Sequence, residues 1–396
     1  MLDTLLIGTS GLLGYSQGLR VVGNNLANVN TPGFKSSQPQ FSDLFDKGSS
    51  TAHAKDGGGG GSRGVGLNTL GAQINFKTGI DQGTGNPLDV KIDGNGMFVI
   101  RREDKLLYSR AGDFQFNAQD ILVNTSGDHV QALDSSGKLG DVQLGTLTRN
   151  PPKATSTIKI SGNLTSTVAT PAIDATMTGL NIIDAAGASH TVNLIFKDQG
   201  GGNFKVTVND VATGTAVGTG ELKFNSGFLL PGFDVVTFAY SSATVPAFDV
   251  KLDFTSNVNS FPTPSSLSLV SQDGYLAGSM TEQGIGADGT LSIRYSNNQT
   301  AKGPRLALAN FHALGDLVQV GGGAFSAAAQ LPVQYGYAGV DAYGKLAPGH
   351  REGSNVDLAE EFSNLILMQR GYQASSHVIS TANDMIQELF DMKGRR

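Results

Sequence analysis

Apolar residues recur every seven positions at both ends of the chain, whereas the long segment between them lacks this period. A period of seven is typical of a helix that buries one face against another helix. It predicts helices within residues 1–30 and 355–396, which we expect to pair as a coiled-coil-like core. The stripe positions, which we assign to a helix-packing seam, are Leu5, Leu12, Tyr15, Leu19, Val22, Leu26, Val29, Leu358, Phe362, Leu365, Met368, Tyr372, Ile379, Ile386 and Leu389.

The first of these helices has an unusual polar face. Between Thr4 and Asn30 its only charged residue is Arg20, and several glycines interrupt it. Each glycine costs about 0.8–1 kcal/mol of helix stability relative to alanine. We therefore expect this helix to fold only when other helices surround it, since small residues let helices approach closely. An ordinary helical hairpin within one chain is the alternative, although a single partner would cover only one face.

The middle of the chain reads as β structure in several blocks. Residues 31–75, with a run of glycines, are expected to be an extended linker. Residues 76–147 and 285–354 show short alternating strands separated by Gly and Asn turns, and we assign them to a β-rich inner body domain. Residues 148–284 are rich in Thr, Val and Ser and have no helical period, which indicates an inserted β-rich outer domain. The chain is thus predicted to be multidomain, with a mainly β body of sandwich-like or barrel-like domains.

Two local signals mark boundaries and turns more sharply. Pro32-Gly33 should end the first helix, and the Ser354…Asp357 spacing resembles a capping box at the start of the second. The apolar runs on either side of the turn at residues 93–96 predict a β-hairpin.

Composition and charge exclude several classes of protein. The net charge of -6 gives no reason to expect a nucleic-acid partner. The absence of cysteine excludes disulfides and thiolate metal sites. No apolar run reaches the roughly 18 residues of a membrane span. Asp3 stands where a secretory signal would be basic, so an exported chain is expected to keep its N-terminus.

Two motifs with possible chemistry have simpler explanations. Gly59-x-Gly61-x-x-Gly64 matches the dinucleotide fingerprint, but it lies inside the glycine run and neither follows a strand nor opens a helix. The segment 89–94 resembles a calcium loop, yet Lys91 takes a position that needs an oxygen ligand. We expect a linker in the first case and a turn in the second, with no cofactor.

Catalytic chemistry has little support in the sequence. None of the six histidines pairs with another at ligand spacing. We expect no catalytic, cofactor-binding or metal-binding residues, and no enzyme. A secreted β-rich enzyme tethered by a helical hairpin stays open as an alternative, because carboxylates are plentiful.

Three segments resemble a known family, the bacterial flagellar rod and hook proteins. Asn24–Lys35 resembles their N-terminal signature, Gly85–Phe98 and Tyr108–Phe114 their body motif, and Ser354–Phe362 with Gln369–Ala374 their C-terminal signature. The positions that carry the family signature are Asn25, Asn28, Asn30, Thr31, Pro32, Gly33, Phe34, Gly94, Gly96, Gln369, Arg370, Gly371 and Tyr372.

The resemblance implies a structural protein of the flagellum. Rod members are commonly shorter, and the insertion at 148–284 makes the chain most similar to the hook members. A hook subunit would form a flexible tubular homopolymer of many copies, held by the seam as its polymerisation interface, that couples rod to filament and transmits torque. Its implied partners are the rod, the hook cap, the hook–filament junction proteins and the type III export apparatus, and its implied location is the flagellum outside the cell. A distal rod protein or another axial or junction protein is the alternative.

Overall fold

The chain folds into two compact units of mainly β structure, and the first unit also contains two long helices. The computed structural model describes residues 2–46, 63–167, 174–242, 245–328 and 330–394. Unit 1 consists of Met1–Gly145, Gln283–Ser292 and Lys302–Arg396. Unit 2 consists of Thr146–Glu282 and Ile293–Ala301. Most of unit 2 is therefore an insertion in the sequence of unit 1.

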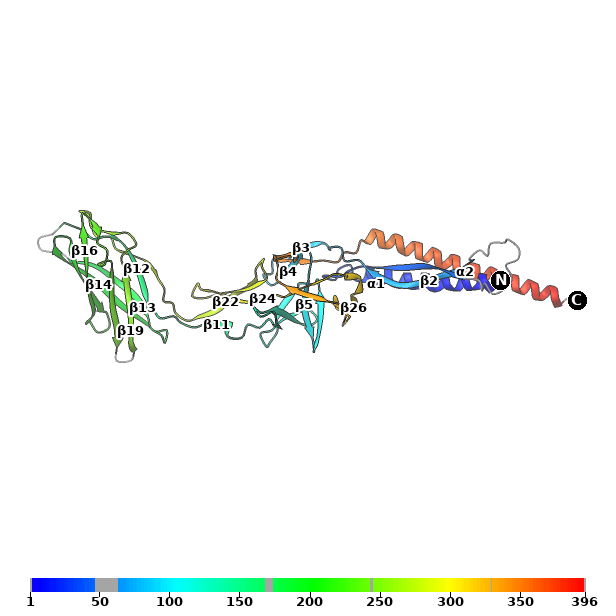
Figure 1. Ribbon diagram of the computed structural model, residues 1–396, viewed down its shortest axis with the longest axis horizontal. Helices are drawn as coiled ribbons and strands as arrows, with labels where there is room; N and C mark the ends of the chain where they lie inside the picture. Colours follow the sequence, from blue (N-terminus) through cyan, green and yellow to red (C-terminus); the bar gives the residue numbers. More distant parts are fainter. Residues whose placement is uncertain (1, 47–62, 168–173, 243–244, 329, 395–396) are drawn as a thin grey trace. The chain divides into compact units, whose positions relative to one another are not determined.

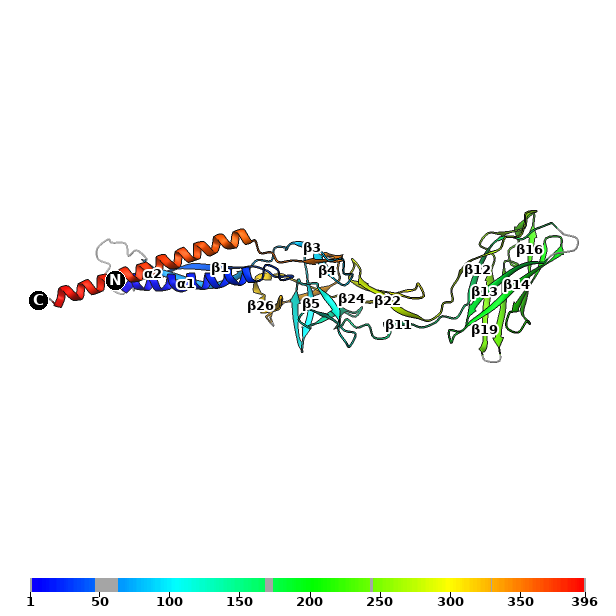
Figure 2. The same ribbon diagram turned by 180° about the vertical axis from the view of Figure 1, so that it is seen from behind.

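The two helices lie at the two ends of the sequence, where the apolar stripes predict them. Helix α1 (Leu2–Ala27) and helix α2 (Leu358–Gly394) lie side by side, as Figures 1 and 2 show from opposite sides. Among the described residues, no helix has both the length and the apolar character needed to cross a membrane.

Glycines form the contact between the helices. A Cβ atom on Gly8 of α1 would lie 2.7 Å from Cγ1 of Ile379, and one on Gly371 of α2 would overlap the ring of Tyr15. Gly8 meets Ile379 and Gly18 meets Met368, so later residues of α1 contact earlier residues of α2. The helices are therefore antiparallel. The glycines that weaken α1 in isolation thus allow the α2 side chains to approach its backbone.

The expected linker after α1 contains strands instead. Strands β1 (Ser37–Asp46) and β2 (Arg63–Ile74) pair antiparallel and pack on α1. The N–H of Leu67 donates to Oγ of Ser10 at 3.1 Å, and the rings of Phe41 and Tyr15 have centroids 6.2 Å apart. The prediction of a linker fails because two register shifts break the alternation by which strands are recognised. The glycine run that carries the fingerprint lies outside the described residues.

One large sheet forms the body of unit 1. Its pairing order is β26 (Val318–Gly321), β27 (Ala324–Ser326), β6 (Lys105–Ser109), β5 (Met97–Arg102), β9 (His129–Leu133), β8 (Leu122–Asn124) and β7 (Phe114–Phe116). The strands that branch from it are β10 (Leu139–Asp141), β25 (Leu308–Phe311) and β28 (Val333–Gly336). A short 3₁₀ turn, η2 (Leu314–Asp316), follows β25. Met97, Tyr108 and Phe325 belong to the buried core on this sheet.

Two small sheets join the segment before α2 to the first half of the chain. Strand β3 (Asp81–Gly83) pairs with β30 (His350–Glu352), and β4 (Val90–Asp93) pairs with β29 (Lys345–Pro348). Strands β4 and β5 therefore belong to different sheets, and the predicted hairpin at 93–96 is wrong. Gly94 and Gly96 have φ values of +113° and +121° there, which only glycine adopts readily. The local pattern located both strands but contained no information about their distant partners.

A four-stranded sheet is formed by strands that lie close to the sequence boundaries between the units. Its order is β11 (Arg149–Asn150), β22 (Gly278–Ile285), β23 (Thr290–Tyr295) and β24 (Thr300–Arg305). The short helix η1 (Gly145–Thr148) precedes it in sequence. Three of these strands, β22, β23 and β24, contain residues of both units.

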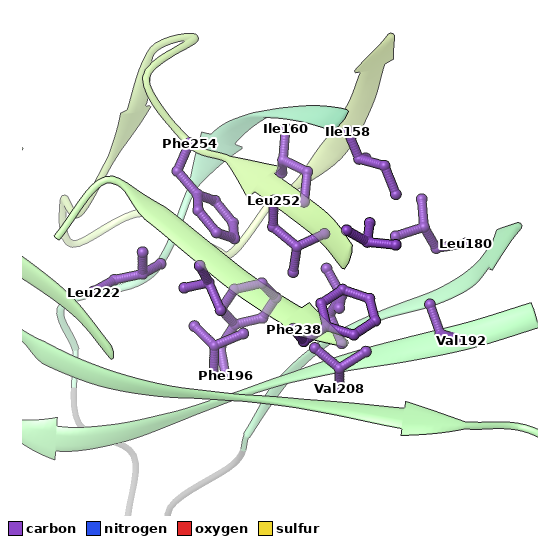
Figure 3. Close-up of a cluster of buried hydrophobic side chains, with 14 of the residues drawn as sticks. Ile158, Ile160, Leu180, Val192, Phe196, Val208, Leu222, Phe238, Leu252 and Phe254 are labelled. Carbon is purple, nitrogen blue, oxygen red and sulfur yellow. The ribbon is translucent and has the colours of Figure 1, made fainter. Parts of the chain in front are cut away.

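Unit 2 is built on a second large sheet. Its order is β13 (Ala175–Ile183), β14 (Ser189–Gly200), β15 (Asn203–Asp210), β16 (Ala216–Asn225), β17 (Phe228–Leu229), β20 (Val258–Asn259), β12 (Thr157–Asn163), β19 (Val245–Asp253) and β18 (Val235–Ser242), with β21 (Ser268–Gln272) paired to β12. Alternate residues of its strands are buried, as the period of two requires. Figure 3 shows Phe196, Phe238 and Phe254 converging on one apolar core.

Candidate assembly site

The N-terminal and C-terminal signature segments meet at Asn25 in α1. Its amide nitrogen donates to the carbonyl of Ser37 at 2.8 Å and to Oε1 of Glu361 at 2.7 Å, while its amide oxygen accepts the N–H of Ser37 at 2.9 Å. The side chain is buried, so each of these polar groups needs its partner. An amide suits this place because its nitrogen can donate two hydrogen bonds while its oxygen accepts from the backbone N–H. Asn25 therefore ties α1 to β1 and to the first turn of α2.

Burial perturbs the carboxyl group at this junction. It raises the pKa of Glu361, and the hydrogen bond from Asn25 acts in the opposite direction. The N-cap of α2 lies nearby: Oδ1 of Asp357 accepts the N–H of Ala359 at 2.8 Å. The predicted capping role of Ser354 is wrong, because its hydroxyl instead accepts the N–H of Val356 and is buried before the helix begins.

A buried ionic cluster extends the junction into the body. The ammonium of Lys35 pairs with Glu352 of β30 and donates to the carbonyl of Lys77 at 2.7 Å. The same carboxylate accepts the N–H of Gly79 at 2.8 Å and lies 3.7 Å from the guanidinium of Arg110. Burial lowers the pKa of Lys35 and that of Arg110, and the charge of Glu352 partly offsets both shifts. One carboxylate thus balances two buried cations from different parts of the chain.

Gly33 shows why the signature requires glycine. Its φ is +66°, its N–H donates to the carbonyl of Glu352 at 2.8 Å, and a Cβ atom there would overlap the backbone of Ala111. Phe34 beside it is buried, and Asn28 accepts a hydrogen bond from the hydroxyl of Thr31 at 3.1 Å.

The remaining signature positions differ in burial. Pro32 is half-buried beside Gly33, Gly94 and Gly96 form the turn before β5, and Gly371 lies under Tyr15. Asn30, Gln369, Arg370 and Tyr372 are exposed. The local backbone accounts for the first group, whereas the part of the chain that the structure describes gives no reason for the exposed group.

The predicted seam residues also divide into two groups. The structure brings Tyr15, Met368 and Ile379 to the contact between the helices. Val22 is buried, and the half-buried members are Leu5, Leu12, Tyr15, Leu19, Leu26, Val29, Leu365, Met368, Ile379 and Ile386. The exposed members are Leu358, Phe362, Tyr372 and Leu389. Their role in polymerisation stays a prediction.

The sequence reasoning missed further apolar residues on the helix surfaces. Leu13 is 59% exposed, Ile366 56% and Leu367 63%. Leu6, Ile7 and Phe390 are also exposed. Each of Leu6, Leu13 and Ile366 follows a seam residue directly, so the apolar stripe is wider than one partner helix can cover. The apolar residues directly after the seam positions were visible in the sequence, but the seven-residue period alone does not include them. Contiguous exposed apolar surface of this kind marks an interaction site.

The carboxylates and histidines of the described residues form no arrangement for metal binding. In the described part of the chain, no group of three or more His, Asp or Glu side chains is arranged to hold a metal ion. Within the calcium-like segment, Lys91 instead pairs with Asp93 at 2.9 Å, and it also pairs with Asp81 of β3 at 3.1 Å. The features that stand out are therefore the buried junction and the exposed apolar helix faces.

Three family profiles match the chain. Residues 5–35 match the flagella basal body rod protein family, residues 91–170 the flagellar hook protein FlgE/F/G D1 domain, and residues 347–392 the flagellar basal body rod FlgEFG protein C-terminal family.

Curated relatives match over nearly the whole chain. Flagellar hook protein FlgE of Salmonella typhimurium is 30% identical over 414 residues, covering 97% of this chain and 98% of the relative. Flagellar hook protein FlgE of Escherichia coli is 28% identical, with the same coverage. The protein of that name from Borreliella burgdorferi is 29% identical, covering 99% and 100%. A crystal structure of Helicobacter pylori flagellar hook protein FlgE2 aligns with a TM-score of 0.46 and 12% identity, covering 67% of this chain and 98% of that one.

Proposed function

Because the chain belongs to the family of flagellar hook proteins, we propose that it is a structural subunit of the bacterial flagellar hook. Relatives of that name match it from one end to the other, including the long insertion. The subunit has a mechanical role in this proposal: many copies form a tube that couples the rod to the filament and transmits torque.

The observation that supports self-assembly is the uneven packing of the two helices. They meet through glycines, and many of their large apolar side chains face away from each other. Burying one such side chain against a neighbour contributes about 1.5–3 kcal/mol. We propose that helices of neighbouring copies cover these faces and form a coiled-coil-like core, with the seam residues and the exposed residues beside them as the polymerisation interface.

In this scheme the buried contacts of Asn25 and Lys35 hold the two helices in a fixed orientation relative to the neighbouring strands of unit 1. Asn25 joins both helices, while the ion pair between Lys35 and Glu352 joins the segments that flank them. Truncating one member of a buried charged pair costs about 3–5 kcal/mol. We propose that this rigidity lets the body pass torque to the helical core instead of rotating freely about it.

The domain division and the partners follow the same proposal. Residues 1–30 and 355–396 would form the core, 76–147 with 285–354 the inner body, and 148–284 the outer domain. The rod, the hook cap and the junction proteins would bind at the ends of the tube. Export would use the flagellar type III apparatus, without a cleaved signal peptide.

Assembly of the purified protein tests this function. Wild-type protein should form tubes visible by electron microscopy above a critical concentration. Leu13→Asp and Ile366→Asp should stay monomeric with unchanged circular dichroism, because a charge in an apolar contact costs several kcal/mol. Val318→Asp is the matched control: this body residue is 60% exposed, as Leu13 is at 59%.

A deletion strain separates the hook from other axial roles. Loss of the gene should leave a complete rod without a hook, and the wild-type gene should restore the hook. An incomplete rod would contradict a hook subunit and favour a distal rod protein. Normal tubes from Leu13→Asp and Ile366→Asp together would show that these faces are not the polymerisation interface.

A further inference from the structure

A groove lies between α1 and the pair of strands β1 and β2. It has a volume of about 680 Å³ and is open to solvent. Its polar lining comes from Gln17, Arg20 and Asn24 on one face of α1 and from Ser37 of β1. Its apolar lining comes from Val21 of α1, Pro39 of β1 and Ala72 of β2. The groove therefore offers a cationic centre with hydrogen-bonding groups on each side and apolar walls.

The charge of Arg20 has no counterpart in the groove. It is the only charged residue of α1 after Asp3. Its side chain is exposed, and none of the carboxylates in the described ranges lies within ion-pair distance of it. Arginine binds carboxylates in a two-pronged geometry, through two parallel hydrogen bonds.

The C-terminal part of α2 has the complementary pattern. Asp384, Glu388 and Asp391 follow the i, i+4, i+7 spacing and so share one face of the helix. Met385, Leu389 and Met392 follow the same spacing one position later, and they are 53%, 45% and 66% exposed. Residues 383–392 contain no Lys or Arg. An acidic stripe thus runs directly beside an apolar stripe.

This part of α2 extends past the start of α1. Ile379 already packs at Gly8, and α1 begins at Leu2, so the residues of α2 after about position 386 have no α1 partner. Phe390 in this part of the helix is 70% exposed within the described part of the chain.

The groove and this end of α2 cannot meet within one chain. Met368 packs at Gly18, close to Arg20, and Glu388 lies 20 residues further along the same helix. At a rise of 1.5 Å per residue, this separates Glu388 from Arg20 by about 30 Å. The complementary surfaces must therefore belong to different molecules if they bind.

We propose that the groove of one subunit binds the C-terminal end of α2 from a second copy of this chain. The acidic stripe faces Arg20, and the stripe of Met385, Leu389 and Met392 packs on Val21 and Pro39. This inference rests on the proposed self-assembly and names one contact within it. It also fixes the stagger of the two copies along their helices at about 30 Å, since Glu388 of one copy takes a place level with Met368 of the other.

Charge reversal tests the contact in the full-length protein. Arg20→Glu should raise the critical concentration for tube formation at least about tenfold, because it sets like charges opposite each other. Glu388→Arg should do the same, and the double variant should recover assembly to within a few fold of wild type. Lys105→Glu, an exposed charge reversal in β6, is the control and should change little. The monomers should keep the wild-type circular dichroism, because each changed side chain is exposed.

Cysteine pairing gives an independent measurement, since the natural chain has no cysteine. Arg20→Cys and Glu388→Cys proteins, mixed and assembled, should form a covalent dimer on oxidation. Arg20→Cys mixed with Ser363→Cys should not, because Ser363 lies far from the end of α2. Wild-type protein that forms no tubes would contradict the proposed function. Normal tubes from Arg20→Glu, no recovery in the double variant, or no cross-link with Glu388→Cys would overturn this contact while leaving self-assembly in place.

Discussion

The core of unit 2 and the helix pair of unit 1 use similar side chains with opposite results. Leu252 and Phe254 in unit 2 are completely buried, whereas Leu13, Leu367 and Phe390 on the helices are more than half exposed. In unit 2 the alternation of the strands points every second residue into one closed core. The helices carry apolar residues over too wide a face for one partner. The large apolar side chains of unit 2 thus gather in one core, whereas many of those on the helix pair stay exposed.

Glycine illustrates the same contrast. In unit 2, Cβ atoms on Gly218 and Gly220 would collide with Phe238 and Val236, so these glycines make room for large core side chains. In α1, Gly8 makes room for a second helix. In unit 2 the glycines leave room for side chains of the same core. In α1 the glycine leaves room for a side chain of the other helix.

Truncating the core of unit 2 should have the largest effect. Phe254→Ala should lower the free energy of unfolding of unit 2 by about 3–5 kcal/mol, because it removes a buried ring and leaves a cavity. Calorimetry should show one transition shifted, with the helical circular dichroism of unit 1 retained. Phe228→Ala, at a ring that is 66% exposed, is the control. Simultaneous loss of the helices would contradict the separate unfolding of unit 2.

Removing the charge of Glu352 should destabilise unit 1 alone. Glu352→Gln keeps an acceptor for Gly79 but removes the carboxylate that pairs with buried Lys35 and lies near Arg110, at a cost of about 3 kcal/mol. Urea denaturation of the variant and of wild type measures this loss in the free energy of unfolding. Glu282→Gln removes the exposed pair with Arg294 and should leave stability unchanged. A loss confined to the unit 2 transition would refute the role assigned to this cluster.

A pair of glycine substitutions should change stability in opposite directions. Gly371→Ala should cost about 1–3 kcal/mol, because its methyl group would overlap the Tyr15 ring. Gly23→Ala should stabilise α1 by about 0.8–1 kcal/mol, since no neighbouring atom lies within 4 Å of the added methyl group. Thermal unfolding followed by circular dichroism distinguishes the two. Equal effects would mean that the glycines do not mark the helix contact.

The smallest expected effect is on the pH dependence of stability, which should differ between unit 2 and the junction in unit 1. Burial alone would raise the pKa of Asp273 in unit 2, but hydrogen bonds from Ser156 and Thr157 lower it from 3.8 to about 2. Its contribution to stability is therefore present above pH 3.8 and lost as the pH falls towards 2. Burial raises the pKa of Glu361 above 4.5, so its contribution is full below that pH and is lost as the pH rises through the higher value.

Neutral variants measure these two contributions. Asp273→Asn should flatten the loss of stability of unit 2 in acid, and Glu361→Gln should flatten the loss at the junction as the pH rises. Denaturation series at several pH values compare each variant with wild type. A slope of the opposite sign for either residue would reverse the assignment.

Both terminal helices and the mainly β body could be predicted, because their signals are local. The seven-residue stripes located α1 and α2, and alternation indicated the strands of unit 2. The pair β1 and β2 was missed because its bulges break that alternation. The hairpin at 93–96 was wrong because strand partners are chosen by distant residues, here 345–348.

The candidate site was only partly predictable for a related reason. The signature marked Asn25 and Gly33, yet nothing near Lys35 in the sequence shows that its partner is Glu352, 317 positions away. Exposed residues such as Leu13 differ from seam residues only in the direction they face, and that direction depends on how the two helices meet.

The pairing of Lys35 with Glu352 also orders events in time. A chain that emerges from its N-terminus presents α1 and Lys35 early and Glu352 late, so the ion pair between them must wait until β30 has emerged. Closing so long a loop is entropically unfavourable until the intervening strands have folded. Until then α1 can pack only against β1 and β2, which follow it directly in the sequence. The contact between the two helices is therefore expected to be among the last to form.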